Sequence, residues 1–304
     1  MIERGAYTDL ESLVRQQYGA FGFSFLPRYA VTSLLSGKHR SKLRGRGLDF
    51  EEVRAYQFGD DIRNIDWKVT ARTRKTHTKV FTEERERPVL VVVDQSSSMF
   101  FGSISATKSV AAAELAALAA WRTLAQGDRI GGIVVSEKAL KTVRPQRSRN
   151  AVLHFLQNIV ELNSGLPFEN NTESSHTPIA QALAEAERIA THDYLVVAIS
   201  SLDQIDDRVI RSLIRLKKHN DVVLGLAFDE MERVLPESEL VVSDGENQVA
   251  VDESDSKIRS DFHSHFTSRM TSLVDQLRGY GVPIFSFDTE HPVADQLRHA
   301  IGRR

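Results

Sequence analysis

One loop in this sequence carries a carboxylate and two hydroxyls at alternate positions. Asp94, Ser96 and Ser98 follow the apolar run 89–93, which has the pattern of a strand buried on both faces. Ligands of an open parallel sheet bind beyond the carboxyl ends of its strands, so this loop lies where sites form. Alternate residues of an extended turn can point at one centre, and hard oxygen ligands suit Mg²⁺. The spacing indicates a magnesium site, although loop and helix-cap chemistry explains the same residues without a metal.

The segments that must position this loop alternate between two spacings of apolar residues, one typical of strands and one typical of helices. Strands are predicted at 89–93, 130–136, 140–143, 194–200, 221–228 and 282–287, and helices at 106–125, 151–162, 179–190, 209–219, 258–280 and 292–301. Two further short strands, 240–242 and 248–251, flank Asp244-Gly245, a favourable hairpin turn. Strands that alternate with helices predict an α/β fold, with a doubly wound, mostly parallel sheet and helices on both faces.

Composition is that of an ordinary folded protein. The 304 residues include 39 Lys+Arg and 41 Asp+Glu, and 41% are hydrophobic. The absence of cysteine excludes disulfides, thiolate nucleophiles and cysteine zinc sites, and it suits a reducing compartment. Apolar stretches fall far short of the ~20 residues that a membrane span needs. Because the first residues also lack the order of a secretory signal, we expect a cytoplasmic protein.

Charge divides the chain into two parts. Residues 1–87 hold 17 Lys+Arg and 12 Asp+Glu, whereas residues 88–304 hold 22 and 29. The hydrophobic pattern changes at the same place, which predicts a boundary near Arg87-Pro88. We expect the α/β domain over 88–304 and a smaller segment over 1–87, with a short helix up to about residue 18 and β-rich extended pieces after it. We expect this segment to dock against the α/β domain.

A second group of carboxylates lies in the N-terminal segment. Asp60, Asp61 and Asp66 could hold Mg²⁺ in a hydrolase or nuclease, with Asp94 as a further ligand. Arginines interleave with them: Arg54, Arg63 and Arg72. Opposite charges placed in this way favour a structural ion network, with Trp67, Ile65 and Tyr56 as a packing anchor beside it.

A basic run at 38–46 carries five Lys/Arg in nine residues. Such a run could contact nucleic-acid phosphates or an acidic protein surface. It contains no aromatic residue that would stack on bases, so a solvated basic loop is the simpler interpretation.

Two sets of residues resemble known families. The motif Asp94-x-Ser96-x-Ser98 resembles the metal-ion-dependent adhesion site of von Willebrand factor A domains. The segment Gly127-Asp128-Arg129-Ile130-Gly131, which precedes a predicted hairpin, also resembles a common feature of those domains. An upstream signature resembles the bacterial family called domain of unknown function 58. Its residues are Gly47, Asp49, Phe50, Glu52, Arg54, Tyr56, Gly59, Asp60, Asp61, Arg63, Ile65, Asp66, Trp67, Ala71 and Arg72.

The resemblance implies further metal ligands from two other loops. Thr177 fits the expected threonine, and an aspartate is usual directly after Ser200, where this chain has Ser201. Asp203, two residues further on, is the candidate substitute. The resemblance also implies Mg²⁺ as the cofactor and a MoxR-type AAA+ ATPase and an unidentified protein client as partners. It predicts a non-enzymatic adaptor in chaperone-like protein assembly, in which a partner's carboxylate completes the metal's shell. The chain has no P-loop motif, so nucleotide hydrolysis is assigned to the ATPase.

Overall fold

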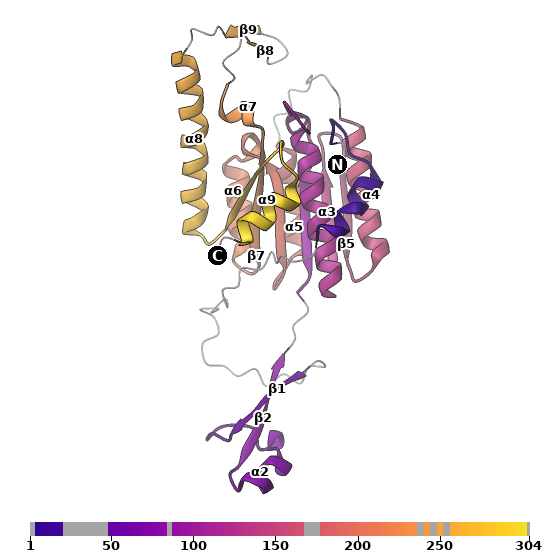
Figure 1. Cartoon of the computed structure of the whole chain (residues 1–304), viewed down its shortest axis with the longest axis vertical. Coiled ribbons are helices and arrows are strands. Elements are labelled where there is room, and N and C mark those ends of the chain that lie inside the picture. The colour runs from indigo at the N-terminus through magenta and orange to yellow at the C-terminus, as the bar shows by residue number, and fades with distance from the viewer. Residues whose placement is uncertain are drawn as a thin grey trace. The chain divides into compact units, whose positions relative to one another are not determined.

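The computed structural model describes residues 4–20, 48–83, 87–166, 177–235, 240–243, 248–251 and 256–302. The chain forms two compact units (Figure 1). The larger unit comprises Met1–Leu26 and Arg87–Arg304, and the smaller unit comprises Pro27–Glu86. The smaller unit ends at Glu86, one residue before the boundary predicted near Arg87-Pro88. The first helix, however, belongs to the larger unit and not to a segment 1–87.

A six-stranded sheet forms the centre of the larger unit, in the order β10-β7-β6-β3-β4-β5. Its strands are β3 (Val89–Asp94), β4 (Ile130–Val135), β5 (Leu140–Gln146), β6 (Leu195–Ser201), β7 (Asp221–Phe228) and β10 (Ile284–Asp288). Only β5 is antiparallel to its neighbour, and the other pairs are parallel. The predicted α/β fold with a doubly wound, mostly parallel sheet is confirmed.

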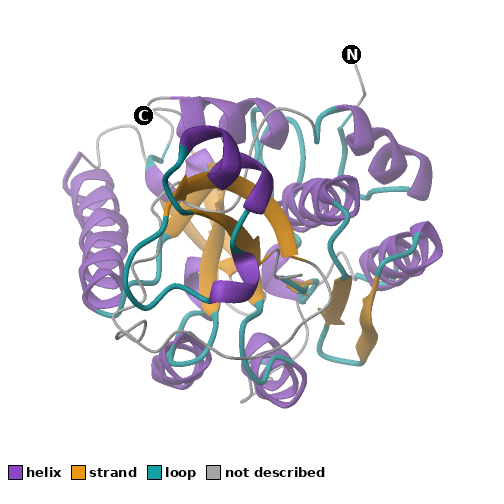
Figure 2. Cartoon of the chain, turned by 90° about the horizontal axis from the view of Figure 1, so that it is seen from below, coloured by secondary structure: helices purple, strands orange, loops and turns teal. Residues whose placement is uncertain are grey.

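Helices lie on both sides of these strands (Figure 2). They are α1 (Leu10–Arg15), α3 (Lys108–Gln126), α4 (Arg149–Ser164), α5 (Pro178–Ile189), α6 (Asp207–Lys217), α7 (Glu230–Arg233), α8 (Ser256–Gly279) and α9 (Val293–Gly302). Short 3₁₀ turns are η1 (Gln16–Tyr18), η3 (Ser97–Met99) and η4 (Leu202–Gln204). Among the described residues, no helix has the length and apolar character needed to cross a bilayer.

A separate hairpin pairs β8 (Leu240–Ser243) with β9 (Gln248–Val251), as the sequence predicts. Its predicted turn at Asp244-Gly245 lies outside the described residues.

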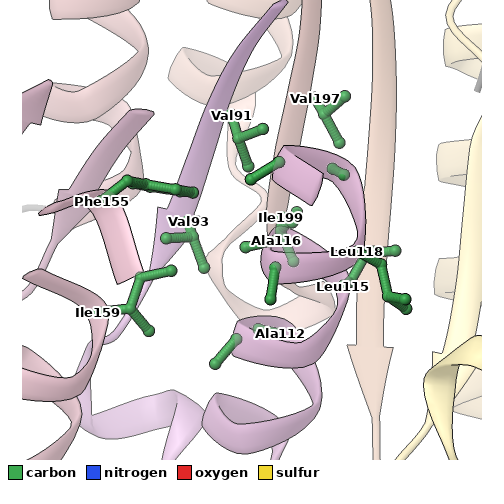
Figure 3. Packing of buried hydrophobic residues seen from close by; sticks show 14 of the residues in the cluster. Val91, Val93, Ala112, Leu115, Ala116, Leu118, Phe155, Ile159, Val197 and Ile199 are labelled. Atoms are coloured by element: carbon green, nitrogen blue, oxygen red, sulfur yellow. The ribbon is translucent and has the colours of Figure 1, made fainter. Parts of the chain in front are cut away.

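The packing of strand β3 explains why its sequence is continuously apolar. Val91 and Val93 pack into one core cluster with α3 and α4, while Leu90 and Val92 pack into a second cluster with α5 and α6. Figure 3 shows the first cluster, in which Val93 lies beside helix α4. Both faces of the strand are covered, so every residue from 89 to 94 is buried and no polar alternation is left.

Helix α1 docks on the larger unit through one buried side chain and several polar contacts. Leu13 is fully buried, and the indole Nε1 of Trp121 donates to the Leu13 carbonyl oxygen over 3.0 Å. Arg4 pairs with Glu114 in α3 at 2.9 Å, and the Thr8 backbone N–H donates to Asn163 Oδ1 over 2.8 Å. These contacts are the physical reason that residues 4–20 belong with the sheet.

The smaller unit is built on two antiparallel strands, β1 (Leu48–Ala55) and β2 (His77–Glu83). A 3₁₀ turn, η2 (Ile62–Asn64), and a short helix, α2 (Trp67–Thr73), connect them. The expected β-rich character is confirmed, but α2 is an addition to the prediction. The basic run 38–46 lies outside the described residues.

Candidate functional site at the carboxyl edge of the sheet

Asp94 is the last residue of β3 and is completely buried. Its Oδ1 accepts from the Ser96 backbone N–H over 2.9 Å, and its Oδ2 accepts from the Ser200 hydroxyl over 2.6 Å. Ser200 comes from the neighbouring strand β6, so two adjacent strands meet at this carboxylate. Among the described residues, no lysine or arginine forms an ion pair with it.

Burial raises the pKa of the Asp94 carboxyl. The hydrogen bonds from Ser200 and Ser96 act in the opposite direction, and the negative charge of Glu137 adds to the rise. Keeping Asp94 ionised in this position is costly unless a cation compensates the charge. Protonation of Asp94 or a compensating cation would each remove this cost.

The serines that follow Asp94 are held by a second acidic residue. The Ser97 backbone N–H and hydroxyl both donate to Glu137 Oε1, each over 2.7 Å. The hydroxyls of Ser96 and Ser98 lie 3.1 Å apart and share a hydrogen bond. These interactions fix the loop so that the two predicted hydroxyl ligands lie together.

Thr177 precedes α5, but its side chain does not cap that helix. The hydroxyl donates to Asp206 Oδ2 over 3.2 Å. The other carboxylate oxygen of Asp206 caps α6, accepting from the backbone N–H groups of Arg208 and Val209. Because Asp206 follows β6 and η4, this bond ties Thr177 to the carboxyl edge of the sheet, where Asp94 also lies.

Asp203 is surrounded by cations. Its carboxylate lies 3.2 Å from Arg269 Nη1 in α8 and 3.8 Å from Lys108 Nζ in α3. Lys108, which is 1% exposed, also pairs with Glu232 in α7. The described interactions of Asp203 thus run to α3 and α8 and not to the Asp94 loop.

Ser201 occupies the position where the resemblance implies an aspartate. Its hydroxyl is fully buried and has no hydrogen-bond partner among the described residues. A buried hydroxyl without a partner is costly, so its oxygen is suited to a ligand or water. The structure thus presents, at the end of β6, a hydroxyl oxygen without a described partner, two residues before Asp203.

Several residues of this site were not named as ligands from the sequence. Ser200 and Glu137 contact the Asp94 loop from other strands and turns, and no local pattern marks them. Asp206 could have been found as a helix-cap residue before the predicted helix 209–219. Its contact with Thr177 joins residues that are 29 positions apart, which only the fold reveals.

The acidic residues of the smaller unit have separate structural tasks. Asp60 and Arg54 form a forked pair at 2.8 and 2.9 Å, while Asp61 caps η2. Asp66 caps α2, and the backbone N–H of Val69 lowers the pKa of its carboxyl. Across the described ranges, no group of three or more His, Asp and Glu side chains could hold a metal ion. Each of the three aspartates thus has a hydrogen-bonding task of its own within the smaller unit, which supports the structural interpretation.

The prediction that Trp67 is a packing anchor is wrong. Its side chain is 70% exposed at the start of α2. A two-stranded sheet with one short helix offers too little apolar surface to enclose an indole ring.

A mostly parallel α/β sheet with one antiparallel edge strand and an Asp-x-Ser-x-Ser loop at its carboxyl edge defines a von Willebrand factor A-like fold. The chain belongs to the family described as "Protein of unknown function DUF58", whose model matches residues 52–271.

Similar proteins have been found by sequence and by structure. The uncharacterized protein Mb1516 of Mycobacterium bovis is 28% identical over 278 residues, covering 90% of this chain and 85% of the relative. The uncharacterized protein Rv1480 of Mycobacterium tuberculosis matches to the same extent. The crystal structure of the conserved hypothetical protein BatB from Bacteroides thetaiotaomicron has a TM-score of 0.42 at 13% identity, covering 72% of this chain and 100% of BatB. The SpRpn10 VWA domain has a TM-score of 0.39 at 12% identity, covering 71% and 95%.

Proposed function

We propose that this chain is a non-enzymatic protein-interaction module that binds Mg²⁺ at the carboxyl edge of its sheet. Asp94, Ser96, Ser98 and Thr177 would hold the ion. One observation carries the proposal: Asp94 is a fully buried carboxylate without a cationic partner among the described residues. A divalent cation would compensate this charge at the place where the fold gathers hydroxyl oxygens.

The donor set suits Mg²⁺. Its atoms are all oxygens, and Mg²⁺ keeps several waters and needs few carboxylates. The unpartnered Ser201 hydroxyl adds one further oxygen to the same edge. Asp203 is less suited to the ion, because Arg269 already compensates its charge.

The bound ion would keep one coordination position open for a carboxylate from another protein. The carboxylates of Asp94 and Glu137 would repel an acidic side chain that approached this loop without the cation. With the ion in place, the partner's carboxylate completes the shell and the attraction depends on the metal. Such a site binds proteins and requires no nucleophile or general base.

The metal part of the proposal is tested by calorimetric titration with Mg²⁺ or Mn²⁺. The unaltered chain should bind the ion and Asp94→Ala should not. Asp203→Ala is the matched control. It removes an aspartate from the same edge of the sheet, but that aspartate is already paired with Lys108 and Arg269, so the variant should still bind the ion. Identical blank traces for the unaltered chain and Asp94→Ala would refute the metal site.

We further propose that the module acts in the cytoplasm as an adaptor between a MoxR-type AAA+ ATPase and a client protein. The family resemblance supports this partner. Affinity purification of the tagged full chain from its native host, with Mg²⁺ or with EDTA, tests the idea. An AAA+ ATPase should co-purify, and clients that use the ion should be lost in EDTA. Repeated purification without any AAA+ ATPase would refute the adaptor role.

A further inference from the structure

A groove of about 370 Å³ lies between α5 and α6 and begins at Thr177. Thr177, just before α5, and Gln181 in α5 line one side, and Arg208, Arg211, Ser212 and Arg215 line it from α6. No carboxylate is part of this described lining. The described lining therefore carries three arginines and no acidic residue, in a chain whose total charge is slightly negative.

The sequence of α6 explains why three arginines share this groove. Arg208, Arg211 and Arg215 are separated by three and four positions, which places them on one face of the helix. The opposite side of α6 packs into the core through Val209 and Leu213. Seven residues of helix cover roughly 10 Å, so the arginines form a row of that length leading away from the carboxyl edge.

Two of the three arginines are available for a ligand. The Arg215 guanidinium forms a forked pair with Glu187, with contacts of 2.8 to 3.2 Å, and donates to the Ser212 hydroxyl. Arg208 and Arg211 are exposed, and neither forms an ion pair with a carboxylate in the described ranges. Arginine side chains bind carboxylates in a forked geometry and are weakly hydrated, which suits them to interfaces.

We infer that this groove binds an acidic stretch of the protein partner. The inference rests on the proposed function: one carboxylate of the partner completes the Mg²⁺ shell, and neighbouring acidic side chains pair with Arg208 and Arg211. Thr177 belongs to both places, because it is a candidate metal ligand and lines the groove. The partner is thus a segment with several closely spaced Asp or Glu residues.

A protein fits the groove better than a nucleic acid does. The described lining has no aromatic side chain on which a base could stack, and single-stranded nucleic acids depend on such stacking. The chain itself is the other possible source of carboxylates. Glu169 and Glu173 precede Thr177 in the sequence and lie outside the described residues.

Fluorescence anisotropy with a labelled peptide of alternating glutamate and serine tests the inference on the full chain. A peptide of glutamine and serine is the neutral control. At low ionic strength with Mg²⁺, the double variant Arg208→Gln/Arg211→Gln should bind the acidic peptide roughly fivefold to thirtyfold more weakly. The control Arg144→Gln/Arg147→Gln removes the same charge from two exposed residues, one in the outer strand β5 and one just after it. It should change the affinity by less than about twofold.

The outcomes separate the groove from the metal site. Loss of peptide binding in the arginine variant, with calorimetric Mg²⁺ binding unchanged, supports the groove. If Asp94→Ala and EDTA leave peptide binding intact while the arginine variant loses it, the groove is supported and the metal bridge is refuted. Equal peptide binding by the unaltered chain and the arginine variant overturns the inference. A labelled single-stranded oligonucleotide that binds more tightly than the acidic peptide, and through the same arginines, also overturns it. So does peptide binding that is absent in the unaltered chain and present in Glu169→Gln/Glu173→Gln, because the chain's own glutamates would then occupy the groove.

Discussion

The charge of Asp94 is the feature on which the candidate site depends. Its folded-state pKa is raised above the ordinary value of 3.8 by burial, so the folded chain holds this proton more tightly than the unfolded chain does. The stability that the protonated group contributes is fully present below the ordinary pKa and is lost as pH rises through the raised one. Metal-free protein at neutral pH therefore carries an electrostatic cost at this residue.

Asp94→Asn should remove that cost. In EDTA we expect the variant to melt at a higher temperature than the unaltered chain at neutral pH, because the amide is neutral and similar in shape. The difference between the two melting temperatures should shrink as the pH falls toward 3.8. Thermal melts over this pH range check the result.

Mg²⁺ provides the complementary measurement. At about 100 times its Kd, it should stabilise the unaltered chain by about 2.7 kcal/mol and leave Asp94→Asn unaffected. A variant that is less stable than the unaltered chain in EDTA would show that the ionised carboxylate is already compensated within the protein.

Ser201 offers a second prediction at the scale of one residue. Ser201→Asp places a carboxylate where a buried hydroxyl has no described partner, beside the Asp94 strand. We expect Mg²⁺ affinity to rise roughly tenfold, since affinity grows with the charge of the ligand set. The metal-free variant should be less stable, because two buried carboxylates then repel each other.

Calorimetric titration and melts in EDTA measure both effects. Ser201→Ala is the control, and it should not tighten Mg²⁺ binding. Unchanged Mg²⁺ affinity in Ser201→Asp would mean that this position does not face the ion.

At the scale of elements, helix α1 provides the clearest test of packing. Leu13 is its fully buried side chain, and Trp121 donates to the backbone at the same residue. Leu13→Ala should lower the free energy of unfolding of the larger unit by about 2 to 5 kcal/mol, through lost burial and the cavity that remains. Denaturant unfolding measures the change.

An exposed residue on the same helix is the matched control. Among the described residues, Glu11 forms an ion pair with Arg15 alone, at the surface, so Glu11→Ala should change stability by no more than about 0.5 kcal/mol. Equal effects of the two variants would contradict the docking of α1 on the sheet.

The elements that the sequence predicts best are those whose pattern is local. Strand β3 is recognisable because both of its faces are covered, and position Asp94 follows directly from the end of that strand. The docking of α1 could not be predicted, because a helix of six residues shows an apolar face without naming what covers it. It joins Leu13 to Trp121, which are 108 positions apart.

The candidate site is predictable to the same extent. Asp94, Ser96 and Ser98 come from one loop, so their spacing alone brings them together. Asp203 was placed by its position after β6, but its ion pairs with Lys108 and Arg269 come from helices far along the chain. The metal itself stays a prediction.

The whole molecule consists of two units with opposite charge. Residues 27–86 hold 14 Lys+Arg and 9 Asp+Glu, whereas the remaining residues hold 25 and 32. Opposite net charges give each unit its own electrostatic preference among partners. The proposed adaptor role would use two such preferences, one for the proposed ATPase and one for the client.

The two tryptophans make the units separately observable, because each unit contains one of them. Trp121 is 4% exposed in the larger unit and Trp67 is 70% exposed in the smaller. In Trp67→Phe, Mg²⁺ at about 100 times its Kd should raise the free energy of unfolding reported by Trp121 fluorescence by about 2.7 kcal/mol. Adding Asp94→Asn to this variant should abolish the increase. If Trp121 reports no increase, the ion does not bind the folded larger unit and the metal site is refuted.

The converse variant, Trp121→Phe, leaves Trp67 to report on the smaller unit. If Mg²⁺ shifts the unfolding midpoint of Trp67 fluorescence in parallel, the two units unfold together. If that midpoint is unchanged, the ion stabilises the larger unit alone.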